Sequence, residues 1–148
     1  MSTQAFEGTT IPDRPAKPRQ AGLTMLIDWG LAGAAQADWL EIGAPYINLA
    51  KIAVGISRLL PADLLRKKIQ LYRQHQVIPF PGGQFLEYAV YHGQASDYLA
   101  AARTAGYGWI EVGVRSSDFN RFRPIWMTEV LSTSRSANVQ CGEGDTET

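Results

Sequence analysis

The sequence predicts an α/β fold built on a parallel sheet. Short apolar segments of the strand type begin near positions 22, 46, 77 and 107, an interval of about 25–30 residues. The segments between them show the apolar spacing of helices. Strands separated by helices at this interval form βαβ units, whose strands run parallel. The chain has 148 residues, of which 45% are hydrophobic, and this is enough for one domain with its own core.

Strands and helices are expected to alternate over the central part of the chain. Residues 23–28 form the first strand, which is apolar as far as Asp28. The other strands are expected at 46–54, 77–80 and 109–112, and the helices at 34–44, 61–75, 84–91 and 95–105. Apolar strands of this kind are typical of a parallel sheet that is covered by helices.

Each helix has a local signal. The first is rich in alanine. Pro61 suits the first turn of the second helix. Ser96 and Asp97 are N-cap types at the start of the last one, and Gly106 ends it. The apolar face of the second helix is expected to hold Leu64, Leu65, Ile69 and Tyr72.

The chain divides into three parts. Residues 1–20 contain three prolines in polar sequence and are predicted to be a flexible leader. Residues 21–130 form the α/β domain, in which residues 125–130 are compatible with one more strand. Residues 131–148 are rich in Ser, Thr and Gly and are predicted to be a disordered tail.

Composition excludes several classes of protein. The formal net charge is +0 and basic residues do not cluster, so nucleic acid is not the expected partner. Cys141 is the only cysteine, which excludes a disulfide framework. No apolar run reaches the roughly 18 residues of a membrane span, and the N-terminus lacks a signal-peptide pattern. The expected compartment is the reducing cytoplasm.

The turn after the third strand is the strongest local signal for a ligand. Pro81, Gly82 and Gly83 connect an apolar strand to a helical segment. Two glycines let the backbone approach a ligand closely, and the helix that follows presents free N–H groups to an anion. A plain strand-to-helix corner would explain the same residues.

Polar residues at the carboxyl ends of the strands are candidates for the site, because ligands gather there in parallel α/β proteins. Lys51 lies in an otherwise apolar run and Glu111 stands between Ile110 and Val112. A buried amine needs a partner or a ligand. Lys51 therefore either binds a ligand or forms a structural ion pair with Asp28 or Glu111.

The remaining candidates follow the second and third strands. Ser57 and Arg58 precede the second helix and could hold a phosphate, although an exposed arginine is more often solvated. Glu87 lies just inside the helix after the glycine pair. Carboxylates together with one amine suit Mg²⁺ and an anionic substrate, since hard oxygen ligands hold the ion.

These segments together resemble the phosphosulfolactate synthase family over about residues 20–113. The matching segments are GLTMLID at 22–28, Lys51 followed by GISR at 55–58, FPGGQFLEY at 80–88 and IEV at 110–112. The glycine-pair segment, with the lysine strand before it, is the most specific part. The resemblance implies a partial TIM-type (β/α) barrel of about four βα units.

The resemblance also implies an activity. Members of this family are lyases that add sulfite to phosphoenolpyruvate with Mg²⁺ and form phosphosulfolactate, a step that serves coenzyme M or sulfolactate formation. By this resemblance Lys51 and Glu111 are catalytic. Asp28 and Glu111 lie near the metal. The substrate-binding residues are Ser57, Arg58, Gly82, Gly83 and Glu87.

The sequence departs from the family pattern in three ways. Trp29 stands where the family usually has a lysine. Glu129 is not followed by the family's lysines, and the helix expected before it is missing. A full barrel also needs about 250 residues. Two functions therefore stay open, which are an enzyme of this type and a truncated, non-catalytic homologue that binds a phosphorylated anion or another chain. An exposed sheet edge favours a homo-oligomer.

Overall fold

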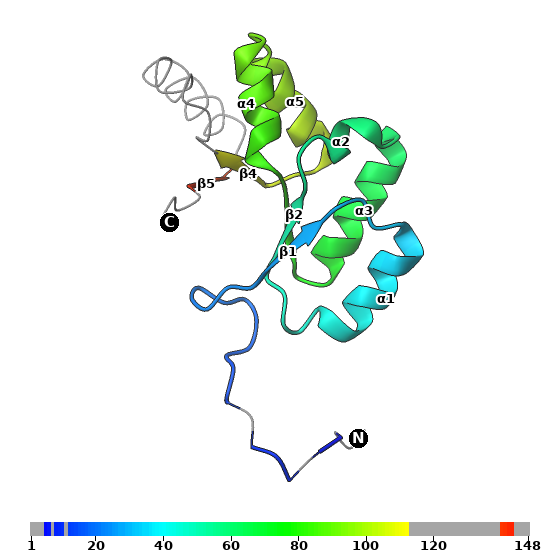
Figure 1. The fold of residues 1–148 in the computed structure, drawn as a ribbon, viewed down its shortest axis with the longest axis vertical. Coiled ribbons are helices and arrows are strands. Elements are labelled where there is room, and N and C mark those ends of the chain that lie inside the picture. Colours follow the sequence, from blue (N-terminus) through cyan, green and yellow to red (C-terminus); the bar gives the residue numbers. More distant parts are fainter. Residues whose placement is uncertain (1–4, 7, 11, 113–139, 144–148) are drawn as a thin grey trace.

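The computed structural model describes residues 5–6, 8–10, 12–112 and 140–143 (Figure 1). Strands and helices alternate along the described chain, as the sequence predicts. The strands are β1 (Met25–Asp28), β2 (Leu49–Ile52), β3 (Ile78–Pro81), β4 (Trp109–Val112) and β5 (Gln140–Glu143). The helices are α1 (Gly33–Gly43), α2 (Ile56–Leu59), α3 (Ala62–Gln74), α4 (Gly83–Tyr91) and α5 (Ala95–Ala105).

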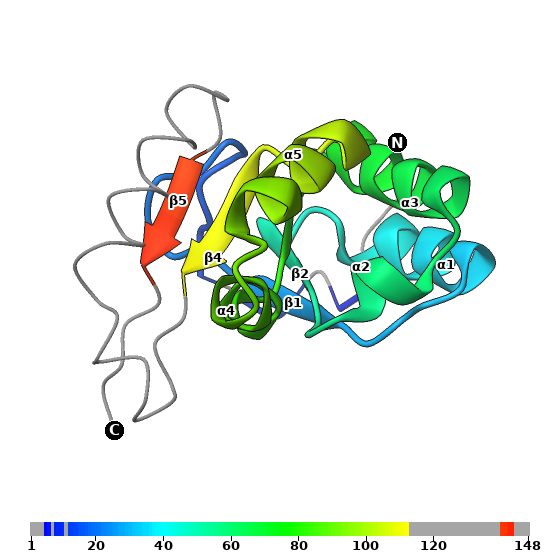
Figure 2. The ribbon, with the colours of Figure 1, turned by 90° about the horizontal axis from the view of Figure 1, so that it is seen from above.

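The strands form parallel pairs. β1, β2 and β3 make one sheet in this order, and β4 pairs with β5 in a second. β4 packs beside β3, and α1, α3 and α5 lie along one side of the strands (Figure 2). This is the arrangement of a partial TIM-type (β/α) barrel, so the predicted fold class is confirmed.

The two faces of the sheet differ in what covers them. Ala50 and Ile52 point toward the helices and are completely buried. Ile27 and Lys51 are register partners, and they point to the other face, because side chains alternate along a strand. We call this second face the inner face, since it would face the axis of a closed barrel.

The core lies between the sheet and the helices in two clusters. The larger joins Ile52 of β2 to Leu65 and Ile69 of α3 and to Leu99 of α5. The smaller joins Leu40 of α1 to Tyr72 of α3. Both clusters include residues of α3, which therefore packs with both α1 and α5.

Helix α3 differs from the prediction in the face that it buries. Leu65, Lys68, Ile69 and Tyr72 are its buried residues, whereas Leu64 is 41% exposed. The predicted place of Leu64 on the buried face is therefore wrong. The apolar stripe is centred one position further along the helix, and it includes a lysine that the prediction left out.

Three local features were not foreseen. α2 is a single turn between Gly55 and Leu60, and no apolar spacing predicts it. The cap residue of α5 is Gln94 and not Ser96 or Asp97. β5 lies in the predicted tail, where no apolar alternation signals a strand. The strand suggested at residues 125–130 lies outside the described residues.

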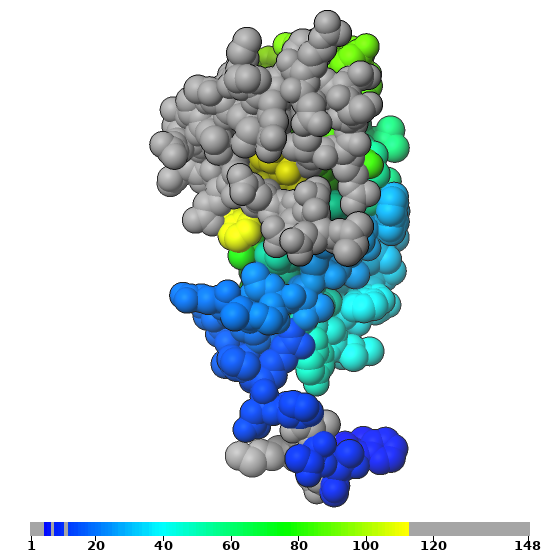
Figure 3. All heavy atoms as spheres, turned by 60° about the vertical axis from the view of Figure 1, so that its left-hand side comes forward, coloured from blue at the N-terminus to red at the C-terminus, as the bar shows by residue number. Residues whose placement is uncertain are grey.

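Basic side chains of the predicted leader reach the body of the protein. The Lys17 ammonium donates to the carbonyls of His75 and Gln76 at 3.1 Å each. Arg19 donates to the carbonyl of Pro45 at 2.8 Å. These contacts lie at the amino ends of β2 and β3. The segment before them, in dark blue, extends away from the body (Figure 3).

Candidate active site

A pocket of about 280 Å³ opens at the carboxyl ends of the strands. It lies on the inner face, where Ile27 and Lys51 point. Five of the predicted site residues belong to strands and turns that meet here. These are Lys51, Gly82, Gly83, Glu87 and Glu111, and Trp29, Val54 and Gln84 complete the wall with Ile27 and Ala53.

An ion pair forms the polar centre of this pocket. The Lys51 ammonium donates to Oε1 of Glu111 at 2.7 Å. Both side chains are partly accessible, at 25% and 20%. β2 and β4 are separated by β3, so the pair crosses the inner face above that strand. Of the two partners that the sequence offered for Lys51, the structure selects Glu111.

The other oxygen of Glu111 is held by the turn that the sequence singled out. The backbone N–H of Gly83 donates to Oε2 at 2.7 Å. Gly83 is the first residue of α4, and free N–H groups at a helix N-terminus favour negative charge. One carboxylate thus bridges an ammonium and a helix N-terminus, and these donors are also suited to a substrate anion.

Gly82 is required by a close approach of two backbone segments. A Cβ on Gly82 would lie 3.0 Å from the Val54 nitrogen and 3.4 Å from Cε of Lys51. The Gly82 N–H also donates to the Ile52 carbonyl at 2.9 Å. The glycine therefore lets the third turn pack directly on the second, which brings α4 to the lysine.

Val54 holds a strained conformation at the edge of the pocket. Its φ is +41°, a region that β-branched residues rarely adopt. Strain of this kind persists only where the surroundings enforce it, and it gathers at functional sites. It also explains why β2 ends at Ile52 rather than at residue 54 as predicted.

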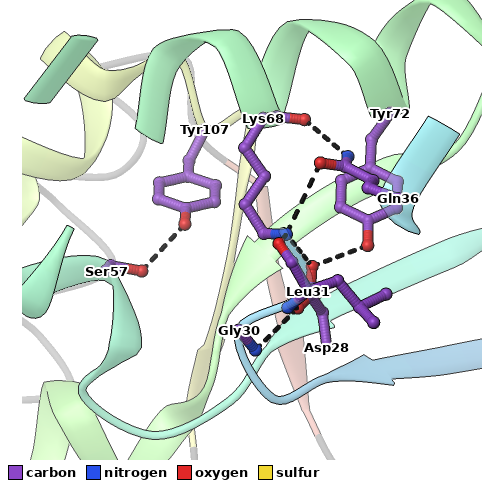
Figure 4. Close-up of polar contacts among 8 residues, drawn as sticks. All are labelled: Asp28, Gly30, Leu31, Gln36, Ser57, Lys68, Tyr72 and Tyr107. Carbon is purple, nitrogen blue, oxygen red and sulfur yellow. Dashed lines mark hydrogen bonds and ion pairs between the residues drawn. The ribbon is translucent and has the colours of Figure 1, made fainter. Parts of the chain in front are cut away.

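Asp28 does not line this pocket, and Figure 4 shows the side chains that surround it. It is completely buried on the helix side of the sheet, where it forms an ion pair with Lys68 of α3. The Tyr72 hydroxyl donates to Oδ2 at 2.7 Å. The N–H groups of Gly30 and Leu31 donate to Oδ1 at 2.8 Å each. Its predicted neighbours, Lys51 and Glu111, lie on the opposite face.

The buried network fixes the ionisation of its members. Burial alone would raise the pKa of Asp28, but the hydrogen bonds from Lys68, Tyr72, Leu31 and Gly30 outweigh it and lower the pKa below its ordinary value. Burial, and then the bond to Asp28, raises the pKa of Tyr72. Asp28 is therefore an ionised structural carboxylate that holds the turn after β1.

Ser57 and Arg58 also lie apart from the Lys51 pocket. The Ser57 and Tyr107 hydroxyls are 2.8 Å apart (Figure 4). Both predicted residues line a separate cavity beside α5. The structure thus gathers Lys51, Gly82, Gly83, Glu87 and Glu111 and places the other three candidates elsewhere.

Sequence reasoning missed Lys68 as the partner of Asp28. The signal was present, because Lys68 follows Leu65 by three residues and precedes Tyr72 by four. This spacing puts it on the buried stripe of α3. A lysine on an apolar stripe requires a buried anion, and Asp28 at the end of an apolar strand was available.

The donors of the pocket suit a hard cation only in part. Glu87 and Glu111 provide carboxylate oxygens, and Mg²⁺ commonly takes one or two carboxylates together with substrate oxygens. Within the described residues no group of three or more His, Cys, Asp or Glu side chains is arranged to hold a metal. Two carboxylates in one pocket fit an ion that the substrate helps to bind.

The sequence of the chain matches a known family over most of its length. The model of the family described as (2R)-phospho-3-sulfolactate synthase (ComA) matches residues 12–145. The chain belongs to this family. The resemblance seen in the glycine-pair and lysine segments is therefore confirmed.

Three curated phosphosulfolactate synthases are similar to this chain over part of their own length. The phosphosulfolactate synthase of Methanothermobacter thermautotrophicus is 34% identical over 108 residues, which cover 73% of this chain and 42% of the relative. That of Methanocaldococcus jannaschii is 31% identical over 101 residues, 68% of this chain and 40% of the relative. That of Bacillus subtilis is 30% identical over 102 residues, which cover 69% of this chain and 40% of the relative.

The chain therefore spans about two fifths of the length of the relatives it matches. Residues 12–145, which the family model matches, include the pocket formed by β2, the turn before α4, and β4. None of the helices in the described ranges is long and apolar enough to cross a membrane.

Proposed function

We propose that the chain carries the active centre of a lyase that adds sulfite to phosphoenolpyruvate and forms phosphosulfolactate. Family membership supports this reaction. The observation that carries the proposal is the bridge from Lys51 through Glu111 to the N–H of Gly83. It gathers a cation, a carboxylate and a helix N-terminus in one pocket at the carboxyl ends of the strands.

The reaction needs an acid next to the carbon that becomes negatively charged. The sulfur lone pair of sulfite forms the new bond to C3 of phosphoenolpyruvate, and the electron pair of the double bond moves to C2. The adjacent carboxylate delocalises this charge, and C2 then takes a proton. Lys51 is the ammonium of this pocket, so we assign it as the proton donor. Before the substrate binds, Glu111 orients Lys51. After the transfer Lys51 is a neutral amine, and it takes a proton back from water, to which its side chain is partly accessible.

The substrate anion would use donors that Glu111 occupies in the described structure. Lys51 and the N–H of Gly83 both point at that carboxylate, and Gly82 lets the turn before α4 pack close to Val54 and Lys51. A substrate carboxylate or phosphate offers the same oxygens. Glu87 lines the pocket beside them. Ser57 and Arg58 remain predicted substrate contacts that lie outside this pocket.

The proposal includes Mg²⁺ because two carboxylates line the pocket. Glu111 and Glu87 would hold the ion. When bound, Mg²⁺ offsets the negative charge that the substrate carboxylate gains during addition. Asp28 stays a predicted ligand, although its two oxygens are bonded to Lys68, Tyr72, Gly30 and Leu31.

A non-catalytic homologue that assembles with another chain is the second candidate. The inner face supports it, because Met25, Ile27 and Ile78 are 44%, 45% and 36% exposed there. Apolar side chains on the inside of a closed barrel are normally packed in layers. A second chain on this face would bury them.

An activity assay separates the two candidates. The unmodified chain is incubated with sulfite, phosphoenolpyruvate and Mg²⁺, and phosphosulfolactate is followed by phosphorus NMR. We expect Lys51→Ala to lower the rate by about 10²-fold or more, because a positioned acid is lost. Lys67→Ala, on an exposed position of α3, is the matched control and should keep full activity. No product from the unmodified chain would favour the non-catalytic homologue.

A further inference from the structure

Two sides of the Lys51 pocket differ in chemistry. The side formed by β1, the turn after it and the residues after β2 is apolar, and we call it the apolar wall. It consists of Ile27, Trp29, Ala53 and Val54. The opposite side carries polar groups of α4 and β4, from Gly83, Gln84, Glu87 and Glu111. The polar side is sufficient for a bare anion, so the apolar wall calls for a ligand with an uncharged part.

Trp29 is the largest and most exposed residue of the apolar wall. Its side chain is 70% exposed, against 45% for Ile27 and 41% for Val54. Apolar surface in water is unfavourable, and a ligand that covers it gains free energy of binding in proportion to the area. Small-molecule sites commonly combine such a surface with a few polar groups that fix the orientation of the ligand.

The backbone on both sides of Trp29 is fixed. Oδ1 of Asp28 accepts the N–H groups of Gly30 and Leu31 at 2.8 Å each (Figure 4). The carbonyl of Asp28 accepts the N–H of Ala53 at 2.9 Å. Gly30 has a φ of +100°, which glycine adopts at little cost. The turn that carries Trp29 is thus in place before a ligand arrives, and preorganisation of this kind lowers the cost of binding.

Lys51 lies at the border between the two sides. It is the register partner of Ile27 on β1 and of Phe80 on β3, and its ammonium reaches Glu111 on the polar side. An acid that places its anionic groups on the polar side and its other carbons on the apolar wall presents the carbon between them to this ammonium. In phosphoenolpyruvate that carbon is C2, which bears both anionic groups.

We propose that Trp29 is a specificity-determining residue of this pocket. Its indole ring contacts one face of the carbon skeleton of an organic acid, whose anionic groups lie against Lys51 and the N–H of Gly83. The pocket therefore distinguishes an organic anion from a bare inorganic one. Sulfite reaches C3 from the face that does not contact Trp29. This inference rests on the function proposed above, and it adds the residue that recognises the uncharged part of the substrate.

Binding without sulfite tests the role of Trp29 apart from the reaction. Phosphoenolpyruvate is titrated into the full chain with Mg²⁺, and its dissociation constant is measured by phosphorus NMR. Inorganic phosphate, measured as a competitor, is the probe without carbon. Trp29→Ala should weaken phosphoenolpyruvate by about fivefold to tenfold, because apolar contact is lost, and should leave phosphate unchanged. Trp29→Phe keeps an aromatic ring and should restore most of the affinity.

Control variants show whether the effect belongs to the pocket. Trp39→Ala makes the same change on α1, where Trp39 is 51% exposed and outside the pocket, and should alter neither ligand. Lys51→Ala removes the ammonium and should weaken both.

The outcomes separate this role from the proposed reaction. If Trp29→Ala binds phosphoenolpyruvate as tightly as the unmodified chain, or loses phosphate to the same extent, Trp29 does not recognise the carbon skeleton, whereas the reaction is untouched. If the binding results are as expected but the unmodified chain forms no phosphosulfolactate when sulfite is added, the reaction fails and the role of Trp29 stands. Failure of phosphoenolpyruvate to bind the unmodified chain would overturn both.

Discussion

Asp28 shows how a one-residue step along a strand decides the role of a side chain. Its neighbour Ile27 points to the inner face with Lys51, whereas Asp28 points to α3 and pairs with Lys68. The sequence predicts that Asp28 lies in the pocket at the carboxyl ends of the strands, because polar residues at strand ends gather there. Alternation along the strand places it on the opposite face. The site therefore depends on Asp28 indirectly, through the turn after β1.

Replacing Asp28 by Asn is expected to destabilise the protein strongly. The buried Lys68 amine would lose its carboxylate partner, and breaking one half of a buried pair costs about 3–5 kcal/mol. Urea unfolding at neutral pH measures the loss. Asp38→Asn, which changes an exposed carboxylate on α1, should alter the free energy of unfolding by less than about 0.5 kcal/mol. Equal effects of the two variants would contradict the buried network.

The lowered pKa of Asp28 predicts that the stability of the fold decreases at low pH. The pKa of Asp28 is lowered in the folded protein from the ordinary value of 3.8. The carboxylate therefore contributes stability above that ordinary value, and this contribution is lost as the pH falls through the lowered folded pKa. Unfolding followed from neutral pH to about pH 2 should show it, and Asp28→Asn should lack this part of the pH dependence. Parallel curves for the two proteins would be inconsistent with an ionised Asp28.

At the scale of the elements, the repeating pattern was sufficient to predict the fold. β4 and α5 have the predicted bounds, and α1, α3, α4, β1 and β3 differ from them by at most a few residues. Apolar periodicity and glycine or proline at the ends dictate such elements locally. Pairings across the sheet are not local, so neither β5 nor the bond from Gly83 to Glu111 could be read from the sequence.

The turn between β3 and α4 allows a matched test of a glycine. Gly82→Ala would press a Cβ against the Val54 nitrogen at 3.0 Å, and we expect a loss of about 1–3 kcal/mol. Gly33→Ala, at the start of α1, meets nothing within 4 Å and should be neutral or slightly stabilising. Thermal unfolding compares the two. A Gly82→Ala protein as stable as the unmodified chain would show that this close approach is not needed.

At the scale of the whole molecule, the inner face presents an exposed apolar row. Met25, Leu49 and Ile78 are register partners that form one row across β1, β2 and β3. In a full barrel such a row is one layer of a packed interior. Here Met25 and Ile78 are 44% and 36% exposed. The helix side of the same strands is buried, so one half of the expected core is formed.

We therefore expect the chain to self-associate through this row. Size-exclusion chromatography with light scattering at micromolar concentration should give a mass above that of one chain. Met25→Lys places a charge in the row, away from the pocket of Lys51, and should shift the mass to a single chain. Ile42→Lys carries the same change on α1, where Ile42 is 79% exposed, and should leave the assembly intact. If the unmodified chain is a stable monomer, the row does not mediate assembly, and if both variants dissociate, the contact is not confined to the inner face.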